Sequence, residues 1–466
     1  MKTFFKLSQD DIKQLTYCVN SSQKMKNKES NNPTVVSVSY VSDFEYKINS
    51  DKTLTITKYI GHDSVLTIPN MIDGRRVSSV GDGAFEKNEF ITKIIISEGI
   101  ESIDCFCFSQ CERLNEVFLP ESVYKIGLGA FMGCEKIEKM TLQNNMDIVS
   151  GFCFLGCKDL TEINISDKIK AIYPGAFQNC LCLGSTGLHL PDNITLIDEK
   201  AFYNCWIHKI EVGDIAERST LTFTQNSRLE FIGKRAFSGG FEDIEGNIFL
   251  KSVVLPNSVK TLDGTFEKCR KLQTITLPDK LELIGDHTFE ECRELKTIKL
   301  PESLKLIGDF AFSACNQLKE LVVPEKVTII GIGAFSCCDN LKFVQLPSSL
   351  NYIPGGLLGL CEELESIKLP ESIKRIDFRA FEGCVKLKRV RIPDKVEIIG
   401  EKAFKDCRNM VAVYIPANVK EISESAFDGC TRLTIYSFRG TEAQKYAKKN
   451  KIKFKILGHF TKWHED

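Results

Sequence analysis

The 466-residue sequence has no excess of either charge, because 61 Lys and Arg stand against 62 Asp and Glu for a net charge of −1. A nucleic-acid-binding chain usually carries a marked basic surplus, so the balance argues against that class of protein. No stretch approaches 18 uncharged apolar residues, which excludes a membrane-spanning helix of the usual kind. The composition that remains, 43% hydrophobic and 26% charged, is typical of a soluble globular protein.

Signatures of catalysis and of metal binding are also missing. The sequence contains no G-x-S-x-G, no P-loop and no H-E-x-x-H. The densest cysteine cluster is Cys105, Cys107 and Cys111, but its spacing is not that of a zinc site and no His lies within 20 residues of Cys105. The sequence therefore predicts a protein that is not an enzyme and that uses neither a metal ion nor a cofactor.

Phenylalanine, with 31 copies, and cysteine, with 19, are abundant, and one repeat explains both. Thirteen of the 19 cysteines lie three positions after a residue of the repeat. Fifteen such units predict a solenoid, because a short repeat can bury its apolar side chains only by stacking on its neighbours. The repeat residue recurs mostly at steps of 23: Phe85, Phe108, Phe131, Phe154, Phe177, Phe202, Phe237, Phe266, Phe289, Phe312, Phe335, Leu358, Phe381, Phe404 and Phe427.

One unit, as in the copy from Phe289, reads A-F-x-x-C-x-x-L-x-x-I-x-L-P-x-x-V-x-x-I-G-x-x. The alternation in L-x-x-I-x-L predicts a strand, V-x-x-I predicts a second extended piece, and A-F-x-x-C predicts a corner. Proline follows the strand in most units, where a residue without an N–H has to lie just past the ladder. The Gly position also holds Pro354, so a left-handed conformation is not obligatory there.

The pattern resembles the BspA-like leucine-rich repeat family, whose units carry the same A-F-x-x-C-x-x-L-x-x-I-x-L-P signature. This resemblance implies a mainly β fold, namely a curved leucine-rich-repeat solenoid of about fifteen 23-residue coils with N- and C-terminal caps. It also implies a non-enzymatic macromolecular binding protein, because several members of the family are surface antigens or adhesins. One departure is an apolar residue where common leucine-rich repeats carry an Asn ladder, as at Leu281, Leu304 and Val327.

The chain divides around the repeats of residues 85–430. Residues 1–34 predict a short amphipathic helix and a polar linker, and residues 35–84 an N-terminal β cap in which Phe44 to Pro69 alternates like two strands. Residues 181–249 carry insertions, the largest of which is expected to form an extra hairpin at Leu221 to Thr224. A capping box at Thr441 and the strand after Asn450 predict a C-terminal cap over residues 431–458. Residues 459–466 form a tail.

The repeat cysteines predict a column of free thiols. Equivalent residues in neighbouring coils lie about 4.8 Å apart, but their side chains run parallel, which does not suit the torsion of a disulfide. The thiols are then expected to pack as small apolar groups. Free thiols, together with the absence of a secretory pattern at Met1 to Lys6, favour the cytoplasm, whereas the family resemblance points to the cell surface.

The residues on either side of the central Ile of L-x-x-I-x-L are expected to point outward, because side chains alternate along a strand. Early coils mix charge signs at these positions, whereas late coils, Ala412 included, gather aromatic and basic residues with no acid. The outward aromatic and basic residues of the late coils are predicted to form a patch that binds a protein or a glycan, in particular an acidic protein segment or a sulfated glycan. The alternatives are an intracellular scaffold rod without a ligand site and a site in the insertion loops. The predicted patch consists of Phe343, Lys368, Arg389, Arg391 and Tyr414.

Overall fold

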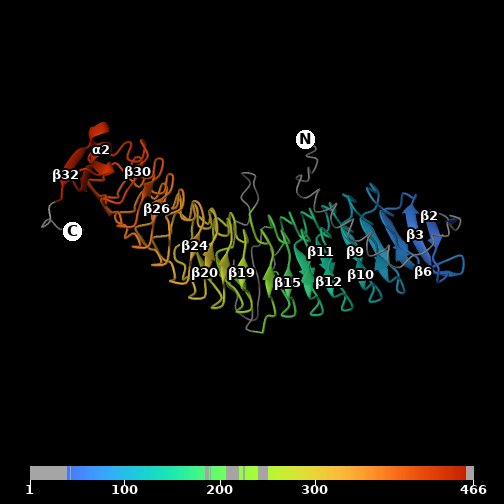
Figure 1. Ribbon diagram of the computed structural model, residues 1–466. Coiled ribbons are helices and arrows are strands. Elements are labelled where there is room, and N and C mark those ends of the chain that lie inside the picture. The colour runs from blue at the N-terminus through green and yellow to red at the C-terminus, as the bar shows by residue number, and fades with distance from the viewer. Residues whose placement is uncertain are drawn as a thin grey trace.

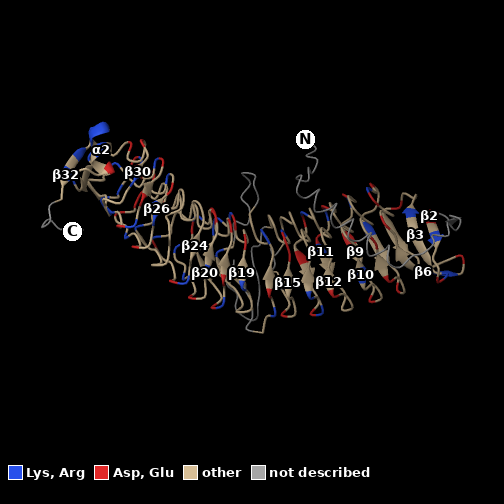
Figure 2. Cartoon of the chain, viewed as in Figure 1, with Lys and Arg blue, Asp and Glu red and all other residues tan. Residues whose placement is uncertain are grey.

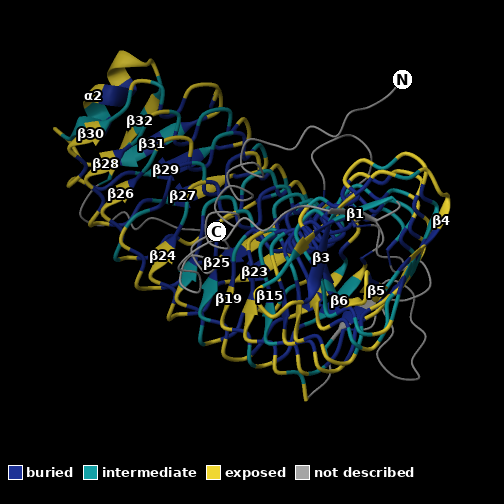
Figure 3. Ribbon diagram, turned by 90° about the vertical axis from the view of Figure 1, so that its right-hand side faces the viewer, coloured by how far each residue is buried: buried dark blue, intermediate teal, exposed yellow. Residues whose placement is uncertain are grey.

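The structure is a computed structural model that describes residues 39–41, 43–183, 188, 190–205, 220–223, 226–239 and 250–457. These residues form a curved rod of stacked coils, with the first strands at one end and α2 (Glu442–Lys449) at the other (Figure 1). Buried residues line the inside of the coils and exposed residues lie at their outer edges (Figure 3). The helix and linker predicted over residues 1–34, most of the insertions and the tail at 459–466 lie outside the described residues.

Most coils contribute one strand to a first parallel ladder, at the L-x-x-I-x-L segment, and the coils of Phe289 and Leu358 join it through single bridges at Thr297 and Ser366. The central apolar residue of this strand is buried, as Ile163 and Val344 are, and the residues beside it face outward. The strands are β4 (Val65–Ile68), β7 (Lys93–Ile96), β9 (Glu116–Phe118), β11 (Lys139–Thr141), β13 (Glu162–Asn164), β16 (Thr220–Thr222), β18 (Ser252–Val254), β20 (Thr274–Thr276), β23 (Glu320–Val322), β25 (Phe343–Gln345), β27 (Arg389–Arg391), β29 (Ala412–Tyr414), β31 (Thr434–Ser437) and β32 (Lys453–Ile456).

The V-x-x-I segments form a second parallel ladder on another side of each coil. Most of its strands are only two residues long, and the second residue of each points into the core. They are β6 (Arg75–Val80), β8 (Ser102–Ile103), β10 (Lys125–Ile126), β12 (Ile148–Val149), β14 (Ala171–Ile172), β15 (Leu196–Ile197), β17 (Phe231–Ile232), β19 (Thr261–Leu262), β21 (Leu283–Ile284), β22 (Leu306–Ile307), β24 (Ile329–Ile330), β26 (Arg375–Ile376), β28 (Ile398–Ile399) and β30 (Glu421–Ile422).

The A-F-x-x-C corner closes each coil and places the repeat Phe in the core. The rings of successive coils stack in parallel, as for Phe131 and Phe154, whose centroids lie 5.7 Å apart with an interplanar angle of 2°. Main-chain hydrogen bonds also run between corners, since the N–H of Phe108 donates to the C=O of Ala130 at 2.8 Å. Leu358 interrupts the aromatic column, and beside it the rings of Phe312 and Phe335 are tilted by 43°.

The corner needs left-handed backbone at two positions that the repeat pattern does not reveal, two residues before the Phe and two after it. Non-glycine residues adopt it there, including Phe106 with a φ of 55° and Gln110 with a φ of 60°. The Gly of the I-G pair, in contrast, is not left-handed at Gly331. A Cβ there would lie 2.4 Å from the main-chain nitrogen of Asp309, so close approach of the preceding coil favours glycine.

The repeat cysteines are buried and hydrogen-bonded. The thiol of Cys111 donates to the C=O of Phe85, 3.1 Å away in the preceding coil, and all thirteen repeat thiols make the equivalent bond. The eighteen cysteines of the described chain carry free thiols. Cysteine therefore serves this position both as a small apolar group and as a donor to a buried carbonyl.

The N-terminal end contains a sixteenth coil that the Phe spacing does not reveal. Tyr59 stacks on Phe85 with centroids 5.3 Å apart, and its N–H donates to the C=O of Ala84 at 2.9 Å as a repeat Phe would. Where the alternation predicted two strands between Phe44 and Pro69, the structure has three, of which β4 belongs to this coil. The others, β2 (Phe44–Ile48) and β3 (Leu54–Tyr59), form a terminal sheet with β1 (Ser39–Val41), and β5 (Met71–Ile72) pairs with β6.

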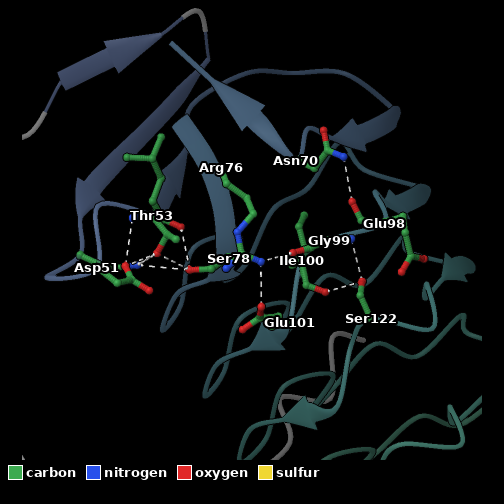
Figure 4. Close-up of polar contacts among 12 residues, drawn as sticks. Asp51, Thr53, Asn70, Arg76, Ser78, Glu98, Gly99, Ile100, Glu101 and Ser122 are labelled. Atoms are coloured by element: carbon green, nitrogen blue, oxygen red, sulfur yellow. Dashed lines mark hydrogen bonds and ion pairs between the residues drawn. The ribbon is translucent and has the colours of Figure 1, made fainter. Parts of the chain in front are cut away.

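Side-chain hydrogen bonds join this terminal sheet to the first coils (Figure 4). The hydroxyls of Thr53 and Ser78 lie 2.8 Å apart, and Thr53 also donates to Asp51 at 2.6 Å. Arg76, in the same strand as Ser78, forms an ion pair with Glu101 of the next coil at 2.7 Å. The open end of the solenoid is thus closed by polar groups with satisfied hydrogen bonds.

The C-terminal helix and strand form where the sequence predicts them. Thr441 is the N-cap of α2, its side chain accepts a hydrogen bond from the N–H of Gln444, and the helix ends at Asn450. Ala443, Tyr446 and Ala447 are the buried residues of the helix. β32 then pairs with β31 and extends the first ladder by one strand.

The extra hairpin predicted at Leu221 to Thr224 is wrong. Thr220–Thr222 forms β16, which pairs in parallel with β18 so that Leu221 lies beside Val253. Leu221 is buried, because it occupies the central apolar position of an ordinary coil. The extra residues come before this strand, so the strand position itself is unchanged.

Candidate binding surface

The first ladder presents two outward rows of side chains, one on each side of the buried central residue. In the N-terminal coils the first row alternates in charge and pairs internally. Lys93 contacts Glu116 and Lys139 contacts Glu162, each with a nitrogen–oxygen distance of 2.8 Å. These coils therefore match the mixed charge predicted for the early repeats. Figure 2 likewise shows both signs interspersed along the rod and basic residues gathered on α2.

The C-terminal coils place aromatic and basic residues side by side in the second row. Arg391, Tyr414, Tyr436 and Lys455 are successive partners across β27, β29, β31 and β32. The Arg391 guanidinium lies 5.6 Å from the centroid of the Tyr414 ring, and the Lys455 ammonium lies 5.4 Å from that of Tyr436. Such distances allow cation–π attraction. We call Lys368, Arg389, Arg391, Tyr414, Tyr436 and Lys455 the C-terminal strand face.

The outward strand positions of the late coils carry no acid, but two of the turns that follow these strands bring carboxylates against the basic row. Arg391 contacts Glu371 at 2.7 Å and Asp394 at 3.5 Å, and the Tyr414 hydroxyl donates to Asp394 at 3.2 Å. Burial, reinforced by the nearby Asp394 charge, raises the pKa of Tyr414 to about 12. The acids were missed because they lie beyond the strand, next to the proline.

The five predicted site residues do not all lie next to one another. Arg391 and Tyr414 are direct partners, and Arg389 is bridged to Ser366 in the coil that carries Lys368. Phe343 is 49% exposed, but its strand β25 pairs with β23 and not with the following coil, so it lies across an interruption of the ladder. Ala412, expected to face outward, is buried. Its side chain is short, and it lies between the longer side chains of Arg389 and Thr434.

Sequence reasoning missed Tyr436 and Lys455 because both follow the last Phe repeat. Tyr436 pairs with Tyr414 and follows it by 22 residues, one fewer than the period of the repeat. The last strand, β32, has no repeat motif of its own. A signal was present in the alternation of Thr434 to Ser437, which continues the strand pattern beyond the last unit.

Other chemistry finds little support in the described part of the chain. No group of three or more His, Cys, Asp or Glu is arranged to hold a metal ion there. No helix among those residues is long and apolar enough to cross a membrane. Most repeat thiols are fully buried, and burial raises the pKa of Cys384 to about 12, so the reactive thiolate is disfavoured.

The parallel ladders, the stacked coils and the 23-residue period make this molecule a solenoid whose repeat length lies in the range of about 20–29 residues typical of leucine-rich repeats. The family model for the BspA type leucine rich repeat region matches residues 78–209, 181–249, 241–365 and 358–454. The chain belongs to this family.

One solved structure shares the fold, and two others align less closely. A leucine-rich repeat protein from Bacteroides ovatus ATCC 8483 aligns at a TM-score of 0.62 and 23% identity, over 90% of this chain and 100% of that one. A leucine-rich cell surface protein from Faecalibacterium prausnitzii A2-165 aligns at 0.42 and 22%, over 90% and 98%. The pneumococcal vaccine antigen PcpA aligns at 0.45 and 17%, over 91% and 100%. Among curated proteins, no match was found.

Proposed function

We propose that this protein is a non-enzymatic binding protein whose C-terminal strand face recognises an acidic segment of a protein partner. The observation that carries the proposal is the row Arg391, Tyr414, Tyr436 and Lys455, in which two aromatic rings lie between two cations on consecutive strands. Tyr and Arg are enriched among the residues that dominate binding energy at protein interfaces.

The charges beside this row define the partner's chemistry. Lys368, Arg389, Lys453 and Lys455 are exposed basic residues around the aromatic pair, while Glu371 contacts Arg391 and Asp394 contacts both Arg391 and Tyr414. The surplus is positive, so an acidic segment would be attracted to the face and oriented on it. A rigid solenoid also holds the side chains in place before binding, which lowers the entropic cost of association.

The experiment compares the wild-type protein with the double variant Arg389→Glu, Tyr414→Ala. Both are immobilised, exposed to lysate and to culture surfaces, and their captured proteins are identified by mass spectrometry. The wild type is expected to retain an acidic protein that the double variant loses, while both melt within a few degrees of each other. Partner binding that survives in the double variant would refute the site, and retention only of sulfated glycan would change the ligand class.

The control variant Arg113→Glu, Tyr124→Ala makes the same two changes far from the C-terminal strand face. Both residues are exposed and lie in the coil of Phe108. This control should bind as the wild type does. If no variant or wild type retains any partner, the scaffold function without a ligand site becomes the better account.

The proposal places this binding function in a reducing compartment, which free thiols favour. Cell fractionation followed by immunoblotting tests that placement. Recovery of the protein from the cell surface would mean that the same binding surface recognises an extracellular partner.

A further inference from the structure

A cleft opens on the first ladder between β9 and β11. β9 does not pair with β11, and β10 does not pair with β12, so this is the one junction of the described coils where both ladders stop. The corner keeps the two coils together, because Phe106 donates to Leu128 and Phe108 to Ala130, each at 2.8 Å. The cleft has a volume of about 540 Å³, within the range of about 300–1,000 Å³ typical of ligand sites.

The corner is reinforced at this same place. Leu128, Phe152 and Leu155 form a second apolar cluster outside the main core, with Phe106 and Met132 packed against it. The coils are therefore tightly joined at the corner and open at the strands, like a wedge. This arrangement makes the cleft a feature of the packing and not of one displaced side chain.

The floor of the cleft is made of apolar strand residues that most other coils bury, although Ile298 is partly buried as well. Val117 and Leu119 are only partly buried, whereas their counterparts in the next coil, Met140 and Leu142, are 3% and 4% exposed. Phe118 stands on the rim, 52% exposed, with the Lys93 ammonium 4.6 Å from its ring centroid. An apolar occupant would complete the burial of this part of the core.

Main-chain groups line both walls of the cleft. Glu116 donates to Thr92 on one side, so in a parallel ladder the alternate residues Val117 and Leu119 direct their N–H and C=O towards β11. Leu142 donates to Asn164 on the other side, so Lys139 and Thr141 direct theirs towards β9. The two walls thus present the donors and acceptors of two strand edges.

Side chains bridge the two coils at one end of the cleft and also beyond it, where main-chain bonds stop. Gln143 donates from Nε2 to the C=O of Leu119 at 2.6 Å, and Asn145 and Ser150 donate to the C=O groups of Glu121 and Ile126. Gln143 stands where most repeats have proline. In the central part of the cleft, the main-chain groups of Val117 on one wall and of Lys139 and Thr141 on the other remain facing the cleft.

We propose that the β9–β11 cleft binds an extended segment of a partner protein, which enters as an added strand between the two coils. The floor selects apolar side chains at alternate positions, to pack over Val117 and Leu119. The rim is already paired, Lys93 with Glu116 and Lys139 with Glu162, so it favours uncharged polar residues at the positions between. Strand addition draws affinity from main-chain hydrogen bonds and specificity from alternate side chains. This site is separate from the C-terminal strand face and does not depend on it.

The test uses a blocked, fluorescein-labelled peptide, Gln-Thr-Ile-Thr-Leu-Pro, which copies residues 273–278 of the chain's own repeat and has the pattern described above. Binding to the full-length protein is measured by fluorescence anisotropy. A second peptide carries N-methyl groups on Ile and the following Thr, which removes one donor towards each wall. The unmodified peptide should bind, and the methylated one should bind at least about tenfold more weakly. Equal binding of the two, or no binding of the unmodified peptide up to about 1 mM, would overturn the proposal.

Two protein variants locate the binding. Thr141→Pro removes an N–H that faces the cleft and leaves those that serve β13, whereas Thr141→Val keeps the N–H at nearly the same volume. The Pro variant should bind the peptide at least about tenfold more weakly, and the Val variant within about twofold of the wild type. The variant Arg389→Glu, Tyr414→Ala should bind it normally. Loss in that variant with full binding by Thr141→Pro would place the peptide elsewhere and refute the cleft.

Discussion

The Tyr446 hydroxyl accepts a hydrogen bond from the N–H of Phe427 at 3.4 Å and donates one to the C=O of Glu424 at 3.1 Å. In an inner coil the same N–H reaches the next corner, as Phe404 does in donating to Ala426 at 2.8 Å. The Tyr446 ring also packs against Phe427, with centroids 5.9 Å apart. One side chain of α2 therefore replaces the corner of the coil that would come next.

Tyr446→Phe should lower the free energy of unfolding by about 1–3 kcal/mol, because it leaves the buried N–H of Phe427 and the partly buried C=O of Glu424 without their partner. Denaturant unfolding measures the change, and hydrogen exchange should show faster exchange at the Phe427 amide. Tyr124→Phe, which removes a hydroxyl from an exposed side chain, should change stability by less than about 0.5 kcal/mol. An unchanged Phe427 exchange rate would mean that the hydroxyl does not cap the corner.

Phe312→Ala should destabilise the protein by about 3–5 kcal/mol, because it leaves a cavity in the column of stacked rings. Phe343→Ala serves as its control, since that ring is 49% exposed on the first ladder. Guanidinium unfolding followed by circular dichroism compares the two. A loss below about 1 kcal/mol for Phe312→Ala would show that the corner Phe does not carry the core.

All 19 cysteines should react with a thiol reagent in denatured protein that was purified without reductant. In the native protein, Cys105, Cys182 and Cys337 should react first among the described cysteines, because the others are buried. Several thiols missing from the denatured count would reveal disulfides and would contradict the hydrogen-bonded thiol column.

Stability should fall at alkaline pH. Burial raises the pKa of Cys384 to about 12, whereas an unfolded cysteine titrates near 8.5. Below pH of about 8.5 both states keep the proton and stability is unaffected. Above it the unfolded chain releases the proton first, so each further pH unit costs about 1.4 kcal/mol for each such thiol.

Unfolding at a series of pH values between 8 and 10.5, with reductant present, measures this slope. Cys384→Ala removes one titrating group and should make the slope shallower, although it also removes the hydrogen bond to Leu358 and lowers stability at every pH. A slope that is the same in the variant would mean that the thiol is not held in its neutral form.

The sequence predicted the repeat, the strands and the corner because each depends on residues that recur at fixed spacing. The coil of Tyr59 was not predicted because it is 26 residues long and has Tyr in place of the repeat Phe. β16 was not predicted because the insertion before Thr220 shifts its place in the sequence relative to the 23-residue spacing, although its place in the ladder is the ordinary one. On the binding surface, outward positions such as Arg391 followed from alternation alone, whereas Asp394 depends on how the next turn folds back.

The cleft had almost no signal in the sequence. Val117 and Leu119 fit the repeat, and only Gln143, in place of proline, marks the next coil as unusual. Whether two coils pair is a property of the stack and not of one unit, and here an apolar cluster that includes Phe106, Leu128 and Phe152 packs at the corner beside the cleft.

The interruption of both ladders between the coils of Phe108 and Phe131 also bears on cooperativity. In a solenoid each coil is coupled only to its neighbours, so the weakest junction sets where unfolding can stop. Three coils, from Tyr59 to Phe108, lie on one side of this junction and thirteen on the other. The short block should therefore melt as a separate unit at lower temperature. A strand bound in the cleft would restore the missing coupling and merge the two melting steps into one, so that the partner would join the short block to the rest of the molecule.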